Sequence, residues 1–175
     1  MSVLPLRFMG DPVLREKARP VAAFDQALKR LAGDMVETMY ETHGVGLAAP
    51  QVGVSGRMFV FDDGETGPIV IVNPELHEAE GEQDGEEGCL SLPGIYFNVV
   101  RAERIRVRGS DLNGDPVEME GVGLLARILQ HETDHIDGKL FLDRLSDEDR
   151  REAMRLLRER ELGLVPRDGD PSRAL

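Results

Sequence analysis

The sequence contains a single cysteine, Cys89, so no intramolecular disulfide can form. It also lacks any apolar run of about 18 residues, which argues against a transmembrane helix. Its first residues show neither the basic start and apolar stretch of a signal peptide nor the Arg- and Ser-rich pattern of a transit sequence. We therefore expect a cytosolic protein that does not enter a membrane and whose lone thiol stays reduced.

Basic residues are scarce as well, because 21 Lys and Arg stand against 33 Asp and Glu, a formal net charge of −12. This balance disfavours a general basic surface for nucleic acid, and we expect no direct DNA binding. Phosphate-binding signatures are missing, since no Gly-Lys-Ser/Thr follows the glycines at 44 and 46, and Pro50 would interrupt the helix of a dinucleotide-binding fingerprint. Length and composition favour one domain, 1–164, followed by a loose polar tail, 165–175.

The segment around which the rest of the chain can be arranged is His131-Glu132-Thr133-Asp134-His135. Two histidines four residues apart lie one turn apart on the same face of an α-helix, so both can reach one metal ion, and the glutamate can reach water on that ion. A helix is expected because the preceding residues are helix-forming and largely apolar, and a glycine follows where a helix would stop. The pattern favours a metal-dependent hydrolase over two core histidines or a closed structural metal site.

A catalytic metal site typically has three protein ligands and one open position. The candidates for the third ligand are Cys89, His43, His77 and the many carboxylates. We favour Cys89, because a thiolate binds metal tightly and the preceding Gly88 allows a close approach. Taken alone, a single cysteine is more often a buried, inert thiol.

Residues 43–53 form a small, mostly apolar segment in which two glycines let the backbone approach another group closely. Gln51 adds a side chain with both a hydrogen-bond donor and an acceptor. The simpler interpretation of this segment is a tight connection from a helix to a strand.

Periodicity and capping signals predict three helices: 25–42, the helix of the histidine motif, and 147–162 with Ser146 as its N-cap. Strands are expected at 57–61, 69–72, 76–82, 96–100, 104–109 and 117–120. Asn113-Gly114 predicts a hairpin turn between the last two strands. Asn73-Pro74 is expected to separate two strands, and 83–87 to be a loop.

Three segments together resemble the signature motifs of the peptide deformylase family, in the family's order. They are Gly44-Val45-Gly46-Leu47-Ala48-Ala49-Pro50-Gln51, Glu87-Gly88-Cys89-Leu90-Ser91 and His131-Glu132-Thr133-Asp134-His135. The resemblance implies an α+β fold with antiparallel β-sheets around a central metal-binding helix, one helix N-terminal to it and one C-terminal. It also implies a metal-dependent hydrolase that removes the formyl group from the N-terminal formyl-methionine of nascent polypeptides and releases formate.

The same resemblance assigns roles to individual residues. Glu132 acts as general base and acid, the Gln51 amide and the Leu90 backbone N–H stabilise the oxyanion, and the Gly46 backbone helps to place the substrate. The metal is Fe2+ in the physiological form, with Zn2+, Ni2+ or Co2+ able to replace it. The implied metal ligands are Cys89, His131 and His135.

Further expectations concern the surroundings of this site and the partners. Asp134 and Arg101 are expected next to the site, fixing a ligand or pairing with Glu87, although an exposed charge is nearly as common a reading of Arg101. The implied partners are formylmethionyl nascent peptides and, through the C-terminal helix, the ribosome near its exit tunnel.

Two alternatives stay open on the residues alone. A metalloprotease would share His-Glu-x-x-His, but such sites are normally completed downstream, and no third histidine follows His135. A non-catalytic metal-binding or ribosome-associated protein would keep the fold. Its mark would be the loss of Glu132, Gln51 or Cys89, and all three are present.

Overall fold

The computed structural model describes residues 2–164, so Met1 and the expected tail, 165–175, lie outside the described residues. The helices are α1 (Gln26–Glu41), α2 (Leu124–Ile136) and α3 (Asp147–Glu161). The strands are β1 (Gly46–Ala48), β2 (Met58–Phe61), β3 (Ile69–Glu80), β4 (Gln83–Cys89), β5 (Leu92–Arg101), β6 (Arg104–Ser110) and β7 (Pro116–Val122). Short 3-10 helices occupy Pro12–Arg15, Ala49–Val52 and Phe141–Arg144.

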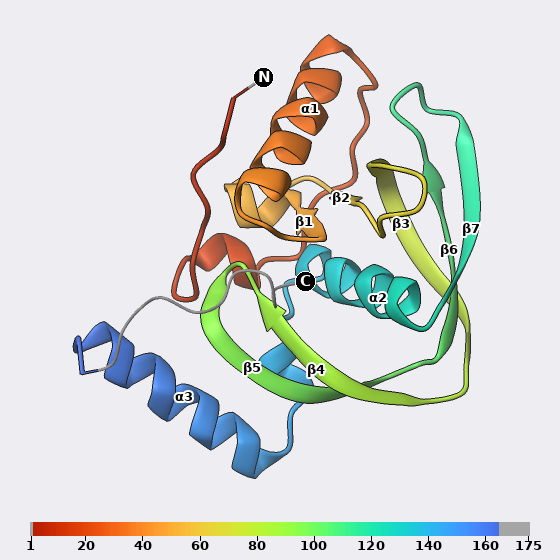
Figure 1. Ribbon diagram of the computed structural model, residues 1–175. Coiled ribbons are helices and arrows are strands. Elements are labelled where there is room, and N and C mark those ends of the chain that lie inside the picture. Colours follow the sequence, from red (N-terminus) through yellow and green to blue (C-terminus); the bar gives the residue numbers. More distant parts are fainter. Residues whose placement is uncertain (1, 165–175) are drawn as a thin grey trace.

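The strands form two antiparallel sheets, and α2 lies between them (Figure 1). The larger sheet has the order β1-β2-β3-β6-β7, and β4 pairs with β5 in a separate two-stranded sheet. Helix α1 precedes these strands in the chain, and α3 follows α2. The arrangement confirms the expected α+β fold, with antiparallel sheets around the helix of the histidine motif.

Strand β2 is buried on both of its faces, because helices cover the sheet on each side. Side chains alternate across a strand. Phe59 and Phe61 accordingly pack in one core with Ile128 of α2, whereas Met58 and Val60 pack in another with Met35 of α1. Helix α2 is thereby held against the sheet by a continuous apolar contact, which gives His131 and His135 a rigid support.

A third core lies where the β4–β5 sheet meets the C-terminal part of the chain. Leu92, Ile95 and Val99 of β5 pack there with Phe141 and with Ala153 of α3. Ala153 is the buried residue of α3, so this helix leaves most of its surface exposed (Figure 1).

The expected helix boundaries are confirmed by their caps. The Asp25 side chain accepts hydrogen bonds from the backbone N–H groups of Ala27 and Leu28, and Ser146 caps α3 in the same way. After α2, Gly138 has a φ of +72°, and a Cβ there would lie 2.7 Å from the Arg15 carbonyl oxygen. The glycine is therefore required both by its left-handed backbone and by the N-terminal arm that passes beside it.

The expectation that Asn73-Pro74 separates two strands was wrong. β3 continues from Ile69 to Glu80, with a shift of register between Val72 and Glu75 where it pairs with β6. Asn73 adopts a φ of +52°, and its amide bonds both backbone groups of Val21. The two residues form a β-bulge within one strand, and Asn tolerates the left-handed backbone that the bulge requires.

The loop expected at 83–87 was also wrong, since these residues belong to β4. Asp, Gly and Glu have low strand propensity, which led to the wrong prediction. Pairing with β5 overrides it, and Asp84 and Glu86 face solvent while Glu87 points inward to buried arginines.

The N-terminal arm has little regular structure, as expected, but it is pinned to the site. Backbone N–H groups of Arg7 and Met9 donate to the carbonyl oxygens of Gln51 and Ser91, at 2.7 and 3.0 Å. Within residues 2–164, no helix combines the length and apolar character needed to cross a bilayer.

Candidate metal centre

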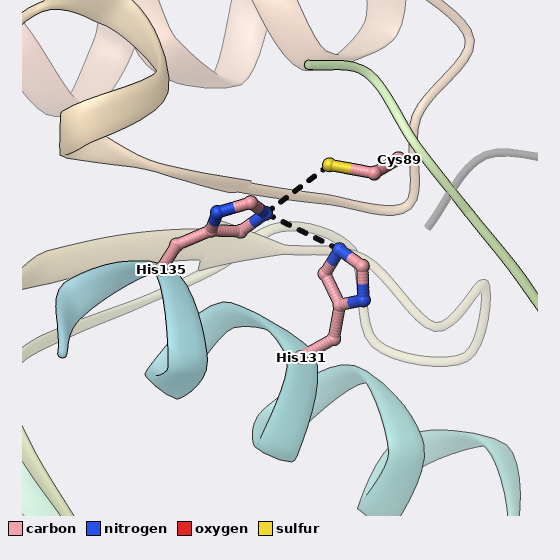
Figure 2. A group of neighbouring side chains, drawn as sticks. All are labelled: Cys89, His131 and His135. Carbon is pink, nitrogen blue, oxygen red and sulfur yellow. Dashed lines mark hydrogen bonds between the residues drawn. The ribbon is translucent and has the colours of Figure 1, made fainter. Parts of the chain in front are cut away.

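Cys89, His131 and His135 converge on one point at the junction of β4 and α2. Their ligand atoms all lie within 4.8 Å of one another, and each residue is at most 2% exposed. The His135 Nε2 lies 3.3 Å from both the Cys89 Sγ and the His131 Nε2 (Figure 2). The other two candidate histidines are elsewhere: His77 contacts Glu118 on the large sheet, and His43 follows α1.

The protonation of His131 is fixed by Glu87 on the side away from the cluster. The His131 Nδ1 lies 2.9 Å from a carboxylate oxygen of Glu87. Burial would raise the pKa of Glu87, but hydrogen bonds from Arg101 and His131 outweigh it and hold the pKa well below its ordinary value. Glu87 is thus an acceptor and Nδ1 must donate, so a neutral His131 ring presents the lone pair of its Nε2 to the cluster.

The cluster fits a divalent cation on its own chemistry. Two imidazole nitrogens and a sulfur are buried within a few ångströms of one another, and electron-pair donors placed so closely need positive charge between them. Without a metal, a proton on His131 supplies part of this positive charge. Burial disfavours the protonated ring, but the hydrogen bonds to Cys89 and Glu87 outweigh burial and raise the pKa of His131 well above its ordinary value. Burial lowers the pKa of His135, and the positive charge on His131 lowers it further.

Glu132 is a buried carboxylate without a hydrogen-bond partner among the described residues. Its side chain is fully buried, and neither oxygen is paired within that part of the chain. Burial raises the pKa of Glu132 to about 7. An unpaired buried carboxylate is costly to fold, so its presence beside the Cys89–His131–His135 cluster makes Glu132 a candidate functional group.

The two glycines of the first motif are explained by what their backbones touch. A Cβ on Gly46 would overlap the Glu132 carboxylate, and a Cβ on Gly44 would lie 2.8 Å from a methyl carbon of Leu90. The expected close backbone approach is therefore confirmed, and Glu132 is the group that strand β1 approaches.

Gln51 brings an amide to the same centre from the 3-10 helix Ala49–Val52. Its Oε1 accepts from the Ala48 backbone N–H at 2.8 Å, and its Nε2 lies 3.6 Å from the Cys89 Sγ and 3.3 Å from the Ser91 Oγ. Leu90, 7% exposed, sits in the turn directly after Cys89. All of the residues expected at the site are thus brought together by β1, the 3-10 helix, the β4–β5 turn and α2.

Behind His131 lies a set of mostly buried charges that we call the buried network: Glu87, Arg101, Arg127 and Asp134, with the exposed Arg144 at its edge. Arg101 binds Glu87 through two hydrogen bonds of 2.8 and 2.9 Å and reaches Asp134 at 2.6 Å. The expected pairing of Arg101 with Glu87 is confirmed, and the exposed reading of Arg101 was wrong because its side chain is 0% exposed.

Two members of the buried network were missed by sequence reasoning. Arg127 donates to Glu87 at 2.8 Å and to the Val99 carbonyl at 2.8 Å. Arg144 binds Asp134 through two hydrogen bonds of 2.6 Å. The sequence did contain one signal for the network, because Arg127 is a charged residue in the otherwise largely apolar start of a helix. An arginine that is buried there requires an anionic partner.

Comparison with known proteins agrees with this geometry. The family model described as polypeptide deformylase matches residues 3–151, which is most of the chain.

The chain belongs to the polypeptide deformylase family.

Relatives and solved structures lead to the same family over nearly the full length. A peptide deformylase of Acidothermus cellulolyticus is 55% identical over 162 residues, covering 92% of this chain and 89% of the relative. The crystal structure of a peptide deformylase from Legionella pneumophila superposes with a TM-score of 0.87 at 48% identity, covering 94% of this chain and 99% of that one. The peptide deformylase structure from Thermus thermophilus also gives 0.87, at 49% identity, covering 92% and 96%.

Membership in this family decides between the alternatives left open by the residues. The chain is a hydrolase of protein biosynthesis that removes the formyl group from the N-terminal formyl-methionine of nascent peptides and releases formate. The family is metal-dependent, and the Cys89–His131–His135 cluster is the group in the described residues that suits a metal. The metalloprotease and non-catalytic readings are set aside.

Proposed function

We propose that Cys89, His131 and His135 hold one Fe2+ ion per chain, and that deformylation takes place beside them. The observation that carries the proposal is the Glu132 carboxylate, which is fully buried, unpaired within the described residues and adjacent to the three converged ligands. A carboxylate that no neighbouring group occupies can accept a proton from a reactant and give it back later in the reaction.

The metal contributes a chemistry that side chains alone lack. When bound, a divalent cation acts as a Lewis acid that lowers the pKa of water and polarises the formyl carbonyl. Imidazole and thiolate ligands suit Fe2+, with Zn2+, Ni2+ or Co2+ as replacements. Because the thiol of Cys89 and ferrous iron are both oxidisable, we expect the iron-loaded protein to lose activity in air.

The residues around the ligands supply the remaining steps. Glu132 removes a proton from the attacking water and then delivers it to the nitrogen of the departing amine. The Gln51 Nε2–H and the Leu90 backbone N–H donate to the formyl oxygen as it becomes negative, and one such donor is worth about 3 kcal/mol in the barrier. The backbone of Gly46, beside Glu132, helps to place the substrate.

The deciding experiment measures formate release from a formyl-Met tripeptide by anaerobic protein loaded with Fe2+. We expect turnover by the wild type, loss of metal and of turnover in Cys89→Ala, and loss of turnover with metal retained in Glu132→Gln. Thr38→Val removes a buried hydroxyl of α1 that bonds Asp34 and Leu4 and no residue of the metal centre, and it serves as the control with normal turnover. Full turnover by Glu132→Gln would disprove its role, and metal analysis of anaerobically purified protein tests the choice of iron.

The cellular setting is also proposed. We infer a single catalytic domain, 1–164, acting in the cytoplasm on chains that leave the ribosome, with α3 as the contact near the exit tunnel. Support comes from the exposed arginines of α3 on a chain of net charge −12, although acidic residues of the same helix pair with some of them. Co-sedimentation with ribosomes should weaken in Arg151→Glu/Arg158→Glu and persist in Arg108→Glu, which alters a distant strand. Equal binding by all three proteins would rule out α3.

A further inference from the structure

The Gln51 amide is oriented by three hydrogen-bonding groups. Its Oε1 accepts from the Ala48 N–H at 2.8 Å, and its Nε2 faces the Ser91 Oγ at 3.3 Å and the Cys89 Sγ at 3.6 Å. A flipped amide would set its NH2 group against the Ala48 N–H, donor against donor, so the orientation is determined by its neighbours. The planar NH2 group carries two hydrogens, one for each of the two remaining acceptors.

We propose that Ser91 is a positioning residue, whose hydroxyl holds one N–H of Gln51 so that the other points to the metal centre. This inference rests on the proposed role of Gln51 as an oxyanion donor. With Ser91 engaged, rotation about the last dihedral of Gln51 is restrained at both ends of the amide. Without that acceptor, only the Ala48 contact at Oε1 and the long contact to sulfur remain, and terminal amide torsions are intrinsically broad.

The backbones that carry the pair are themselves fixed relative to each other. Arg7 N–H donates to the Gln51 carbonyl and Met9 N–H to the Ser91 carbonyl, at 2.7 and 3.0 Å, so the same N-terminal arm bridges both residues. Both side chains are buried, with Gln51 0% and Ser91 1% exposed. The hydroxyl is therefore a preorganised acceptor, and water has little access to replace it.

Ser91 is separated from the ligand Cys89 by one residue, so loss of the hydroxyl must be distinguished from damage to the metal site. A positioning role predicts a lower kcat with unchanged KM and metal content, because a misdirected donor weakens stabilisation that develops in the transition state. A purely structural role predicts a lower denaturation midpoint, or less bound metal, with kcat per metal ion unaltered.

The test is a double-mutant cycle on Ser91→Ala and Gln51→Ala, using Co2+-loaded protein and a formyl-Met tripeptide. Gln51→Ala should lower kcat by about 100-fold or more, as for other oxyanion donors. Ser91→Ala should lower it about tenfold, and the double variant should be no slower than Gln51→Ala, since a positioning residue has nothing left to position. Ser91→Thr, which keeps the hydroxyl, should restore most of the rate, and Thr38→Val is the control for loss of a buried hydroxyl.

The outcomes separate this inference from the proposal beneath it. If Gln51→Ala keeps full kcat, both the oxyanion role and the positioning role are overturned. If Gln51→Ala is slow but Ser91→Ala is normal, or if the two losses multiply in the double variant, only the role of Ser91 is overturned. Side-chain amide NMR of 15N-labelled protein gives a readout independent of turnover: the Gln51 NH2 resonances should shift in Ser91→Ala and stay near their wild-type positions in Ser91→Thr.

Discussion

Two regions of the molecule pair arginine with carboxylates in opposite environments. The buried network behind His131 has Arg101 and Glu87 at 0% side-chain exposure. A second set, the surface ladder, runs across β3, β6 and β7, where the partner side chains are 34–71% exposed. Its members are Glu78, Glu80, Arg104, Arg106, Arg108, Glu118 and Glu120.

The contact distances of the two sets overlap, at 2.6–2.9 Å in the buried network and 2.7–4.0 Å on the surface ladder, so distance alone does not separate every pair. Arg104 lies 2.7 Å from Glu120 on the surface ladder, and Arg101 lies 2.8 Å from Glu87 in the buried network. Exposed pairs are solvated whether or not they meet, and contribute little. Buried partners have lost their water and are stabilised by one another. Removing one of them leaves the other as a buried charge with neither partner nor solvent. The network therefore holds His131 in place, whereas the ladder chiefly keeps a strand surface polar.

The largest effect is expected from Arg101→Met, which leaves the carboxylates of Glu87 and Asp134 short of a buried cation. The free energy of unfolding should fall by about 3–5 kcal/mol. Urea denaturation measures it, with Arg104→Met on the surface ladder as the matched control. A loss no greater than that of the control would remove the distinction between the two regions.

The next largest effect is expected from Glu87→Gln, which keeps the shape of the side chain and removes its charge. The amide is a weaker acceptor for the His131 Nδ1–H, so metal affinity should fall by about 10- to 100-fold. Competition with a chelator for Co2+ gives the affinity, and Glu118→Gln on the surface ladder should bind Co2+ as the wild type does. An unchanged affinity in Glu87→Gln would show that Glu87 does not orient this ligand.

Arg144→Ala should have an intermediate effect, because its side chain is 41% exposed while its partner Asp134 is 8% exposed. We expect a loss of about 1–2 kcal/mol in stability, near the lower end for hydrogen bonds to charged groups. Thermal and urea denaturation check the value, with Arg15→Ala, whose partner Asp143 is 35% exposed, as the control. Equal losses in the two variants would mean that burial of the carboxylate is not the deciding factor.

The smallest effect is expected from Arg106→Ala on the surface ladder, although Arg106 contacts both Glu78 and Glu120. Its denaturation midpoint should match the wild type, and any difference seen at low ionic strength should vanish when salt screens the charges. A large, salt-independent loss would place the ladder with the buried network after all.

Much of the fold and of the proposed centre was predictable because the signals are local. Asp25 and Ser146 cap their helices within three residues, and the histidine spacing places both rings on one face of α2. Cys89 was favoured on its chemistry, and the structure places it with the two histidines. The family resemblance connected the three motifs, and the family is confirmed over residues 3–151.

What failed depended on contacts distant in sequence. Strand β4 is built from poor strand formers, and its inward Glu87 is stabilised by Arg127, 40 residues away. Asn73 looked like a strand end because its tie to Val21, 52 residues away, is invisible in the local pattern. Propensity describes a segment in isolation, so it fails where tertiary partners decide the conformation.

The chain also contains two hairpin ends with very different tolerance to change in length. Between β6 and β7, Asn113 and Gly114 are exposed, so a peptide tag inserted there should leave the fold and the metal centre intact. Between β4 and β5, Leu90 and Ser91 span from Cys89 to Leu92, the residue paired with it across the hairpin. One added residue would shift Cys89, the Leu90 backbone N–H and Ser91 together, so we expect an insertion in this turn to disrupt the proposed metal centre.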